Sequence, residues 1–279
     1  MLLLSVLAFD LQGHRGARGL RPENTLAAFE HALELGVDTL ELDLGLTSDG
    51  VLVVHHDTHL SGDTARLGGV WIEEPIALHE LTLEQVQRYD VGRPNPDSDY
   101  PARWPEQVAV DGQAPPTLAA VLALSDTVRF NLETKLDPKE PGHTATPAAF
   151  ARALREAIPV ELRPRVTVQS FDWRTLDLVT EEFQTACLTS PKTVGRNSPW
   201  TGSLRPQDYR SIPELVLAAG CDIWSPHHLQ VRSGRVEEAH GLGLRVIPWT
   251  VNTTDLAAEL MAMGVDGLIT DYPDRIGRP

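Results

Sequence analysis

Residues 13–57 decide the fold and read GHRGARGLRPENTLAAFEHALELGVDTLELDLGLTSDGVLVVHHD. Apolar side chains recur at helical spacing after Asn24 and Thr25, either of which can cap a helix. Gly36 marks the expected end of that helix, because glycine is the usual residue just beyond a helical C-terminus. A helix is therefore predicted between a Gly-His-Arg-Gly turn and a following strand.

Two strands are predicted after this helix. Residues 39–46, TLELDLGL, alternate so that four leucines face one side while Glu41 and Asp43 face the other, which is the period of a strand. Residues 51–54 are fully apolar and lead directly into a His-His-Asp triple. Because adjacent strand residues point to opposite faces, only one histidine of that triple can face the interior of a sheet.

From residue 117 onward, strand-like runs alternate with helix-like runs, which predicts a parallel sheet. This number of units in 279 residues predicts an α/β fold, a TIM-type (β/α)8 barrel. Nine strand-like runs are available for eight positions, and the link between the runs at 39–46 and 51–54 is too short for a crossover helix. One of those runs is therefore peripheral, or the barrel lacks a helix there. We expect helices at 118–124, 147–157, 173–182, 206–219, 236–240 and 255–263, and strands at 128–133, 166–169, 186–188, 223–224, 245–249 and 267–270.

Residues 58–116 differ from the rest of the chain. They are rich in proline and contain one short helical pattern, at 82–88. A structureless loop of this length is unusual in a compact domain. We therefore expect a small insertion after the early strands that packs over the barrel mouth and shapes substrate access. It is too short for a separate domain, so residues 1–279 are expected to form a single barrel domain.

Composition narrows the classes of partner. Hydrophobic residues make up 42% of the chain, enough for a sizeable core, and the formal net charge is -15. A surface that acidic repels phosphate backbones and anionic membranes, so we expect no nucleic-acid partner. An anionic small molecule would need a local positive site, made by a metal ion or by a few placed cationic side chains.

The beginning of the chain bears on location. No apolar run reaches the roughly 18 residues of a membrane span, so we expect no stable membrane anchor. The apolar start at residues 1–12, MLLLSVLAFDLQ, lacks a basic leading segment and a clear cleavage site. We interpret it as a lead-in to a first strand and expect a cytoplasmic protein. A trimmed secretory signal, with a periplasmic or secreted location, is the alternative.

The two cysteines, Cys187 and Cys221, have no spacing typical of a metal site. Both fall near strand-like runs, and we expect buried free thiols. A disulfide between neighbouring strands stays open as the alternative.

Three carboxylates lie on predicted barrel strands. Glu41 and Asp43 share one strand face, and Glu133 ends the run FNLE with Lys135 two residues on. A solvated strand face is the plain alternative, but the leucines on the opposite face indicate a buried strand, where carboxylates repel each other unless a cation holds them. Three carboxylates without cysteine favour one hard divalent cation, Mg²⁺ or Ca²⁺, over zinc.

Histidines also end strands. His14 and Arg15 follow the first strand and open a glycine-rich turn of the kind that binds anions, while His56 follows the third run. Two imidazoles at two strand ends suit a general base and a general acid near neutral pH. Later strands end near Phe171 and Trp249, which are interpreted as rim packing or as the apolar wall of a small-molecule pocket.

The order of these motifs resembles the glycerophosphodiester phosphodiesterase family. The resemblance rests on HRGARGLRPENTLAAF, ELDLGLTSDGVLVVHHD, FNLETK, VQSFDW, WTVN and DGLITDYPD, and it spans residues 13–274. The first two blocks are highly specific and the others support them. The family fold is a TIM-type barrel with an early insertion, in agreement with the proline-rich stretch.

The resemblance implies hydrolysis of glycerophosphodiesters to sn-glycerol 3-phosphate and an alcohol. It implies a divalent cation held by Glu41, Asp43 and Glu133, and catalytic histidines at positions 14 and 56. It also implies phosphate contacts from Arg15 and Lys135. The family's His-Asp pair maps onto residues 56 and 57, which makes His55 the neighbour that points away.

Three alternatives remain at this point. A phosphodiesterase of the same barrel type could act on lysophospholipid or sphingolipid head groups. A barrel could bind phosphodiesters or a metal without turnover. A carbohydrate-active barrel could use Glu41 and Asp43 as an acid–base pair, since two residues along a strand separate them by about 7 Å. The histidines and cationic residues fit a phosphate better.

Overall fold

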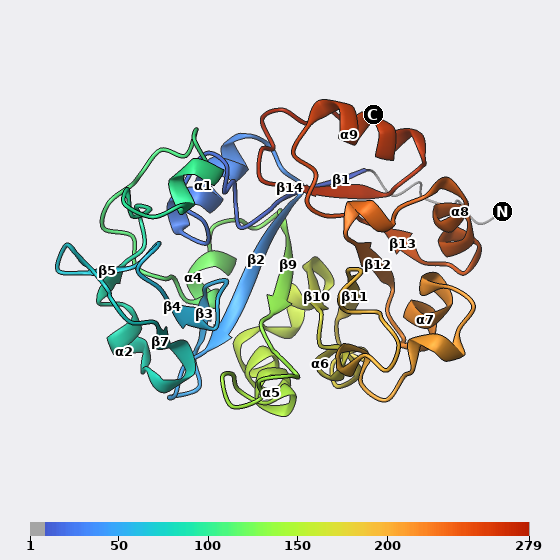
Figure 1. Ribbon diagram of the computed structural model, residues 1–279, viewed down its shortest axis with the longest axis horizontal. Helices are drawn as coiled ribbons and strands as arrows, with labels where there is room; N and C mark the ends of the chain where they lie inside the picture. The colour runs from blue at the N-terminus through green and yellow to red at the C-terminus, as the bar shows by residue number, and fades with distance from the viewer. Residues whose placement is uncertain (1–8, 279) are drawn as a thin grey trace.

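The computed structural model describes residues 9–278. Its main sheet contains eight parallel strands in the order β13-β12-β11-β10-β9-β2-β1-β14, shown in Figure 1. The strands are β1 (Asp10–Gly13), β2 (Thr39–Leu46), β9 (Arg129–Thr134), β10 (Val166–Ser170), β11 (Gln184–Thr189), β12 (Ile223–Pro226), β13 (Arg245–Val246) and β14 (Gly267–Thr270).

Backbone hydrogen bonds join the two ends of this sheet. The amide of Asp266 donates to the carbonyl of Val246 over 2.9 Å, and the amide of Ile269 donates to the carbonyl of Pro248 over 3.0 Å. The sheet therefore closes on itself as the predicted TIM-type (β/α)8 barrel. Helices that follow its strands are α1 (Leu26–Glu34), α4 (Leu118–Leu122), α5 (Pro147–Ala157), α6 (Trp173–Asp177), α7 (Ile212–Ala218), α8 (Ser233–Gly241) and α9 (Thr254–Ala262).

The ninth strand-like run is peripheral. Strand β3 (Leu52–Val54) pairs antiparallel with β2 and lies off the path of the barrel. It needs no crossover helix, because antiparallel neighbours can be joined by a short turn. The chain then runs through the proline-rich stretch before α4 returns it to the barrel.

That stretch contains short elements: β4 (His59–Leu60), β5 (Arg66–Leu67), β6 (Val70–Trp71), β7 (Ile76–Ala77), α2 (Leu83–Val86), β8 (Tyr89–Asp90) and α3 (Tyr100–Arg103). Figure 1 shows most of them beside β3, at the opposite side of the molecule from α7 and α8. The insertion packs on a small core of its own that includes Val53 of β3. Backbone and side-chain bonds tie it to the turn after β1, among them the amide of Gln107 to the carbonyl of Arg18 at 2.7 Å. The assignment of residues 1–279 to one domain stays a prediction.

The helix and strand at the start follow their local sequence. The side chain of Thr25 accepts a bond from the amide of Ala28 and caps α1 as expected. All eight residues of β2 are buried, and its leucines belong to the main core between sheet and helices. Glu41 and Asp43 consequently face the barrel interior.

The interior of the barrel has two chemically different halves. Polar side chains from β1, β2, β9 and β10 fill one half, and bonds such as Asn131 to Gln12 (2.8 Å) and to Gln169 (3.0 Å) connect them. A small apolar cluster fills the other half and consists of Ala186, Ile223, Ile247 and Ile269, with Trp249 packed against it. This division places polar chemistry beside β2 and an apolar wall opposite it.

Three predicted elements are shorter than expected. The helix predicted at 206–219 begins only at Ile212, because Ser211 adopts an extended conformation and caps the helix there. Strand β13 ends at Val246, two residues before Pro248, which has no amide to donate to a neighbouring strand. Helix α6 ends at Asp177 rather than at residue 182.

The expectation of free thiols is wrong. Cys187 on β11 and Cys221, just before β12, form a disulfide with a Cα–Cα distance of 5.9 Å. The two strands are neighbours, with Cys187 in register with Trp224, so their adjacency in the barrel brings the sulfur atoms together.

Among the described residues, no helix is both long and apolar enough to span a bilayer. The predicted lead-in at the start of the chain falls largely on residues 1–8, outside the described range.

Candidate active site

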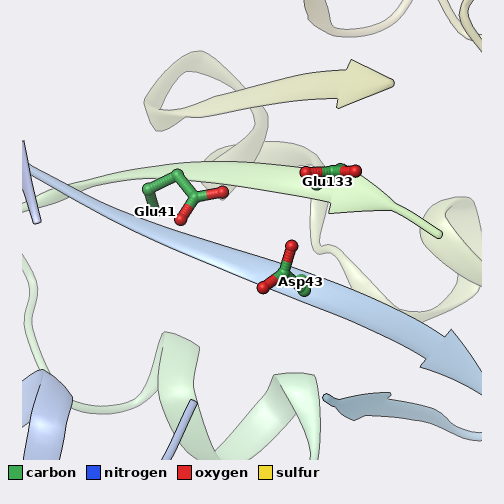
Figure 2. A group of neighbouring side chains, drawn as sticks. All are labelled: Glu41, Asp43 and Glu133. Carbon is green, nitrogen blue, oxygen red and sulfur yellow. The ribbon is translucent and has the colours of Figure 1, made fainter. Parts of the chain in front are cut away.

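Three carboxylates meet inside the barrel mouth. In the β2–β9 pairing, Asp43 lies opposite Glu133, and Glu41 lies two residues earlier on the same face of β2. One oxygen from each carboxylate lies within 4.8 Å of the others. Figure 2 shows the three side chains on the two neighbouring strands. The parallel register of β2 and β9 thus brings Glu41, Asp43 and Glu133 together in one cluster.

Burial and mutual repulsion split the protonation of this cluster. Burial raises the pKa of Glu41 well above its usual value, and the charges of Asp43 and Glu133 raise it further. Burial also raises the pKa of Glu133 to about 7, against the pull of Lys135. Asp43 behaves in the opposite way: although burial opposes ionisation, Lys135 and Arg15 hold its pKa well below the usual range. Protein cations therefore keep Asp43 ionised, whereas Glu41 and Glu133 have too little positive charge beside them to offset their burial.

With every carboxylate ionised, the site as a whole carries an excess of negative charge. Five buried or nearly buried carboxylates face only three cationic side chains, a difference of two charges. In addition, Oδ1 of Asp43 is buried without a hydrogen-bond donor. Hard oxygen ligands, a missing donor and a deficit of two positive charges fit a divalent cation. The carboxylates are Glu23, Glu41, Asp43, Glu133 and Asp271, and the cations are Arg15, Arg18 and Lys135.

The turn after β1 places His14 against the cluster. This turn is so tight that a Cβ on Gly13 would lie 2.2 Å from the carbonyl oxygen of Gly16, so only glycine fits there. His14 is buried, with Nε2 at 3.9 Å from Oε2 of Glu41. Its Nδ1 lies 2.6 Å from Oδ1 of Asp271. Since an ionised carboxylate only accepts, that bond puts the ring proton on Nδ1 and leaves Nε2 facing the cluster.

Asp271 is itself tightly held. Nε of Arg18 donates to its Oδ1 over 2.8 Å, and the amide of Asn252 donates to its Oδ2 over 2.7 Å. Although burial opposes ionisation, His14 and Arg18 hold the pKa of Asp271 below its usual range. Burial also lowers the pKa of His14, which keeps this imidazole neutral near pH 7.

Arg15 and Lys135 lie on the same cluster. Nε of Arg15 is 3.2 Å from Oδ2 of Asp43, and its Nη1 donates to Glu23 over 2.7 Å. Nζ of Lys135 donates to Glu133 over 2.7 Å and lies 3.5 Å from Oδ1 of Asp43. Both predicted phosphate-binding side chains therefore reach the carboxylates from the ends of β1 and β9, the strands on either side of β2.

The His-His-Asp triple behaves as the strand alternation predicts. The ring of His55 turns towards the carbonyl of His59, with Nε2 at 3.2 Å. His56 instead borders the cavity at the barrel mouth, and its Nδ1 lies 2.6 Å from Oδ1 of Asp57. Burial, followed by the charges of Arg15 and Lys135, lowers the pKa of His56 to about 4.

These groups surround one cavity of about 150 Å³, which we name the reaction cavity. Phe171 and Trp249 form its apolar side, with ring centroids 5.4 Å apart in an edge-to-face contact. The structure thus brings all nine predicted site residues together. Eight of these residues line the reaction cavity: His14, Arg15, Glu41, His56, Glu133, Lys135, Phe171 and Trp249. The ninth, Asp43, contacts Arg15 and Lys135 from β2.

Several polar neighbours were not predicted from the sequence. The amide of Gln169 donates to Oε1 of Glu41 over 2.7 Å, and the amide of Asn24 donates to Oδ2 of Asp43 over 2.8 Å. Asp271 directly follows the last strand, in the same kind of position as Glu133, and that signal could have identified it. Arg18 and Glu23 join the site through contacts to Asp271 and Arg15 that no local sequence pattern shows.

Comparison with known proteins agrees with this arrangement. Residues 14–275 match the model of the Glycerophosphoryl diester phosphodiesterase family. A glycerophosphodiester phosphodiesterase of Bacillus subtilis (strain 168) is 30% identical over 268 residues, covering 94% of this chain and 83% of that protein. A crystal structure from Silicibacter pomeroyi superposes with a TM-score of 0.82 at 33% identity, covering 95% of this chain and 90% of the other.

A third relative shares the fold. The Oleispira antarctica phosphodiesterase was solved in complex with the product sn-glycerol-3-phosphate; it superposes with a TM-score of 0.70 at 22% identity and covers 96% of this chain and 94% of that chain. The family match covers seven of the eight barrel strands, β1 excepted, and every predicted site residue. The chain therefore belongs to the glycerophosphoryl diester phosphodiesterase family of enzymes.

Proposed function

We propose that this enzyme hydrolyses glycerophosphodiesters to sn-glycerol 3-phosphate and an alcohol, using a divalent cation and histidine acid–base catalysis. The observation that carries the proposal is the placement of two imidazoles, His14 and His56, around one cavity with the three carboxylates, Arg15 and Lys135. The product complex of the Oleispira antarctica relative supports sn-glycerol 3-phosphate as the product.

The acidic cluster is the proposed metal site. Glu41, Asp43 and Glu133 would hold one cation, and Mg²⁺ and Ca²⁺ both suit three oxygen ligands. When bound, such an ion supplies Lewis-acid stabilisation of the charge that develops on the phosphoryl oxygens. Arg15 and Lys135 add positive charge on the same side of the cavity.

The two histidines move protons in the proposed reaction. An attacking oxygen, from the glycerol 2-hydroxyl or from water, forms a new bond to phosphorus while the bond to the alcohol oxygen breaks. One histidine takes the proton of the attacking oxygen at Nε2, because Nδ1 of each ring is directed to a carboxylate. The other histidine delivers a proton to the leaving oxygen. Attack by the 2-hydroxyl would give a cyclic phosphate, which water opens in a second step with the histidine roles exchanged.

Asp271 is the proposed positioning residue for His14. It accepts from Nδ1 and thereby sets the ring tautomer, and its own orientation is set by Arg18 and Asn252. It does not line the reaction cavity, so its contribution acts through the imidazole.

The first test is release of sn-glycerol 3-phosphate from glycerophosphocholine, with EDTA and after adding back Mg²⁺ or Ca²⁺. We expect release that stops with EDTA and returns with a divalent cation. His14→Ala and His56→Ala should each lose about 10²- to 10⁴-fold in rate while the protein remains folded, as thermal unfolding checks. His31→Ala is the matched control, since that histidine lies on the surface of α1 beside Glu34.

Three results would reject this proposal in whole or in part. Release that is insensitive to EDTA would reject the metal site. A folded protein that releases nothing from glycerophosphocholine with either metal, but acts on micellar lysolipid, would favour the lysophospholipid alternative. Binding of the diester without release of alcohol would favour a non-catalytic barrel.

The disulfide bears on location. Disulfides persist in oxidising compartments and are rare in the cytosol. We therefore propose a periplasmic or secreted enzyme instead of the cytoplasmic one expected from the sequence. Trapping free thiols in intact cells of the source organism tests this: both cysteines protected from a maleimide until reduction is the expected result, and two reactive thiols after unfolding would reject it.

A further inference from the structure

A second cavity adjoins the reaction cavity on the side of the insertion. It measures about 190 Å³ and is lined by residues of the β1–α1 turn and by insertion residues from Ser61 to Gln107; we name it the insertion cavity. Arg15, Arg18 and His56 line both cavities. A phosphate at this shared wall would place one ester arm in the reaction cavity and the other in the insertion cavity.

The walls of the insertion cavity are rich in polar groups that the protein leaves unused. Oε1 of Gln107 is buried without a hydrogen-bond donor. Among the described residues, the side chains of Ser61, Asp63 and Thr64 take part in no hydrogen bond or ion pair, although all three line the cavity. A carboxylate, two hydroxyls and an amide oxygen together suit a ligand that carries several hydroxyl groups.

The aromatic residues of this cavity are already engaged. The guanidinium carbon of Arg18 lies 4.1 Å from the ring centroid of Trp104, and the hydroxyl of Tyr100 donates to Glu23. A trimethylammonium group is recognised by a cage of exposed aromatic faces, whereas one face of Trp104 is covered by a cation. The apolar lining consists of Pro22, Val91 and Pro94 with the rims of these rings, which offers little to an acyl chain.

The volume also limits the occupant. At about 30 Å³ per water molecule, 190 Å³ is the volume of about six waters. A cavity of this size takes a small alcohol. A short polyol therefore fits the insertion cavity and matches its hydrogen-bonding groups.

We infer that the insertion cavity binds the leaving alcohol and selects a short polyol over choline. This inference rests on the proposed function, because it assigns the two arms of the same phosphodiester to the two cavities. Asp63 and Thr64 are the proposed specificity-determining side chains, contributed by the insertion and remote from the carboxylate cluster.

The test compares kcat/KM for glycerophosphoglycerol and glycerophosphocholine, which share the glycerol phosphate arm and differ in the alcohol. The wild-type enzyme should prefer glycerophosphoglycerol. The double variant Asp63→Asn, Thr64→Val should lower the ratio of the two kcat/KM values by at least about tenfold, since it removes a charge-assisted and a neutral hydrogen bond. Asp97→Asn is the matched control: this exposed aspartate of the same insertion lies outside the cavity, and its ratio should equal that of the wild type.

The outcomes separate the two proposals. Hydrolysis of both substrates with an unchanged ratio in the double variant, or a wild-type preference for choline, would overturn the assignment of the insertion cavity while leaving the proposed function intact. No hydrolysis of either substrate by folded wild-type enzyme with Mg²⁺ or Ca²⁺ would overturn the proposed function itself, and this inference with it.

Discussion

Replacing Asp271 by asparagine is the sharpest probe of how His14 is held. The two side chains have nearly the same shape, so the change removes charge and one acceptor with little change in packing. Asp271 accepts short bonds from His14 (2.6 Å), Arg18 (2.8 Å) and Asn252 (2.7 Å). An asparagine offers one acceptor oxygen and a donor group that faces other donors, so it cannot satisfy all three.

The expected magnitude follows from these bonds. A hydrogen bond to a charged group contributes about 1.5–3 kcal/mol, and each 1.36 kcal/mol is a factor of ten in rate. Loss of one such bond to the imidazole, at about 2–3 kcal/mol, predicts a fall in kcat/KM of about 30- to 150-fold. The fall should be concentrated in kcat, because Asp271 lies behind His14 and does not line the reaction cavity.

The assay is steady-state release of sn-glycerol 3-phosphate at saturating divalent cation, with thermal unfolding measured on the same samples. Asp274→Asn serves as the matched control, because this neighbouring aspartate is exposed and should leave kcat within about twofold of the wild type. A kcat/KM for Asp271→Asn within threefold of the wild type would refute the positioning role. A loss of activity that tracks a loss of folded protein would refute it equally.

Three further predictions concern stability and metal binding. The disulfide closes a loop of 34 residues, for which loop entropy predicts a stabilisation of about 3.8 kcal/mol. The double variant Cys187→Ala, Cys221→Ala should therefore have a free energy of unfolding lower by about that amount in urea titrations. Coincident unfolding curves of variant and wild type would contradict this. The pKa of Glu23 is about 2 in the folded protein against 4.5 in the unfolded chain, because Arg15 and Arg18 outweigh its burial. Its ionised form therefore stabilises the fold by about 3 kcal/mol above pH 4.5. This stabilisation is lost as the pH falls towards 2. Glu23→Gln should therefore flatten the pH dependence of stability over that interval, and a parallel curve would contradict the assignment. Glu41→Gln should weaken Mg²⁺ or Ca²⁺ binding at least about tenfold in calorimetry, and unchanged affinity would remove Glu41 from the ligand set.

The start of the chain was predictable because its signals are local. The alternation of β2 depends on neighbouring residues alone, and so does the cap of α1 at Thr25. The alternation of β2 was enough to single out Glu41 and Asp43, and a strand-end position singled out Glu133. Their convergence needed one further fact, the parallel register of β2 and β9, which the barrel fold supplies.

The features that sequence reasoning missed depend on contacts between distant segments. Cys187 and Cys221 pair because β11 and β12 are neighbours in the barrel, and the spacing of the two residues carries no sign of it. The insertion cavity could not be predicted either, because the strands of the insertion have two residues each and are too short to show any periodicity. Asp271 had a local signal, but its bond to His14 exists only when the barrel closes.

The pairing of β1 with β14 determines when the reaction centre is completed during synthesis. His14 and Asp271 are separated by 257 residues, and ribosomes add about 5–20 residues per second, so about 13 to 50 s pass between the two. During that interval β1 has neither its last neighbour nor the carboxylate that orients its histidine. A nascent chain can carry the acidic cluster of β2 and β9 well before it carries an oriented His14, so the catalysis proposed for that histidine would begin only after the last strand has joined the barrel.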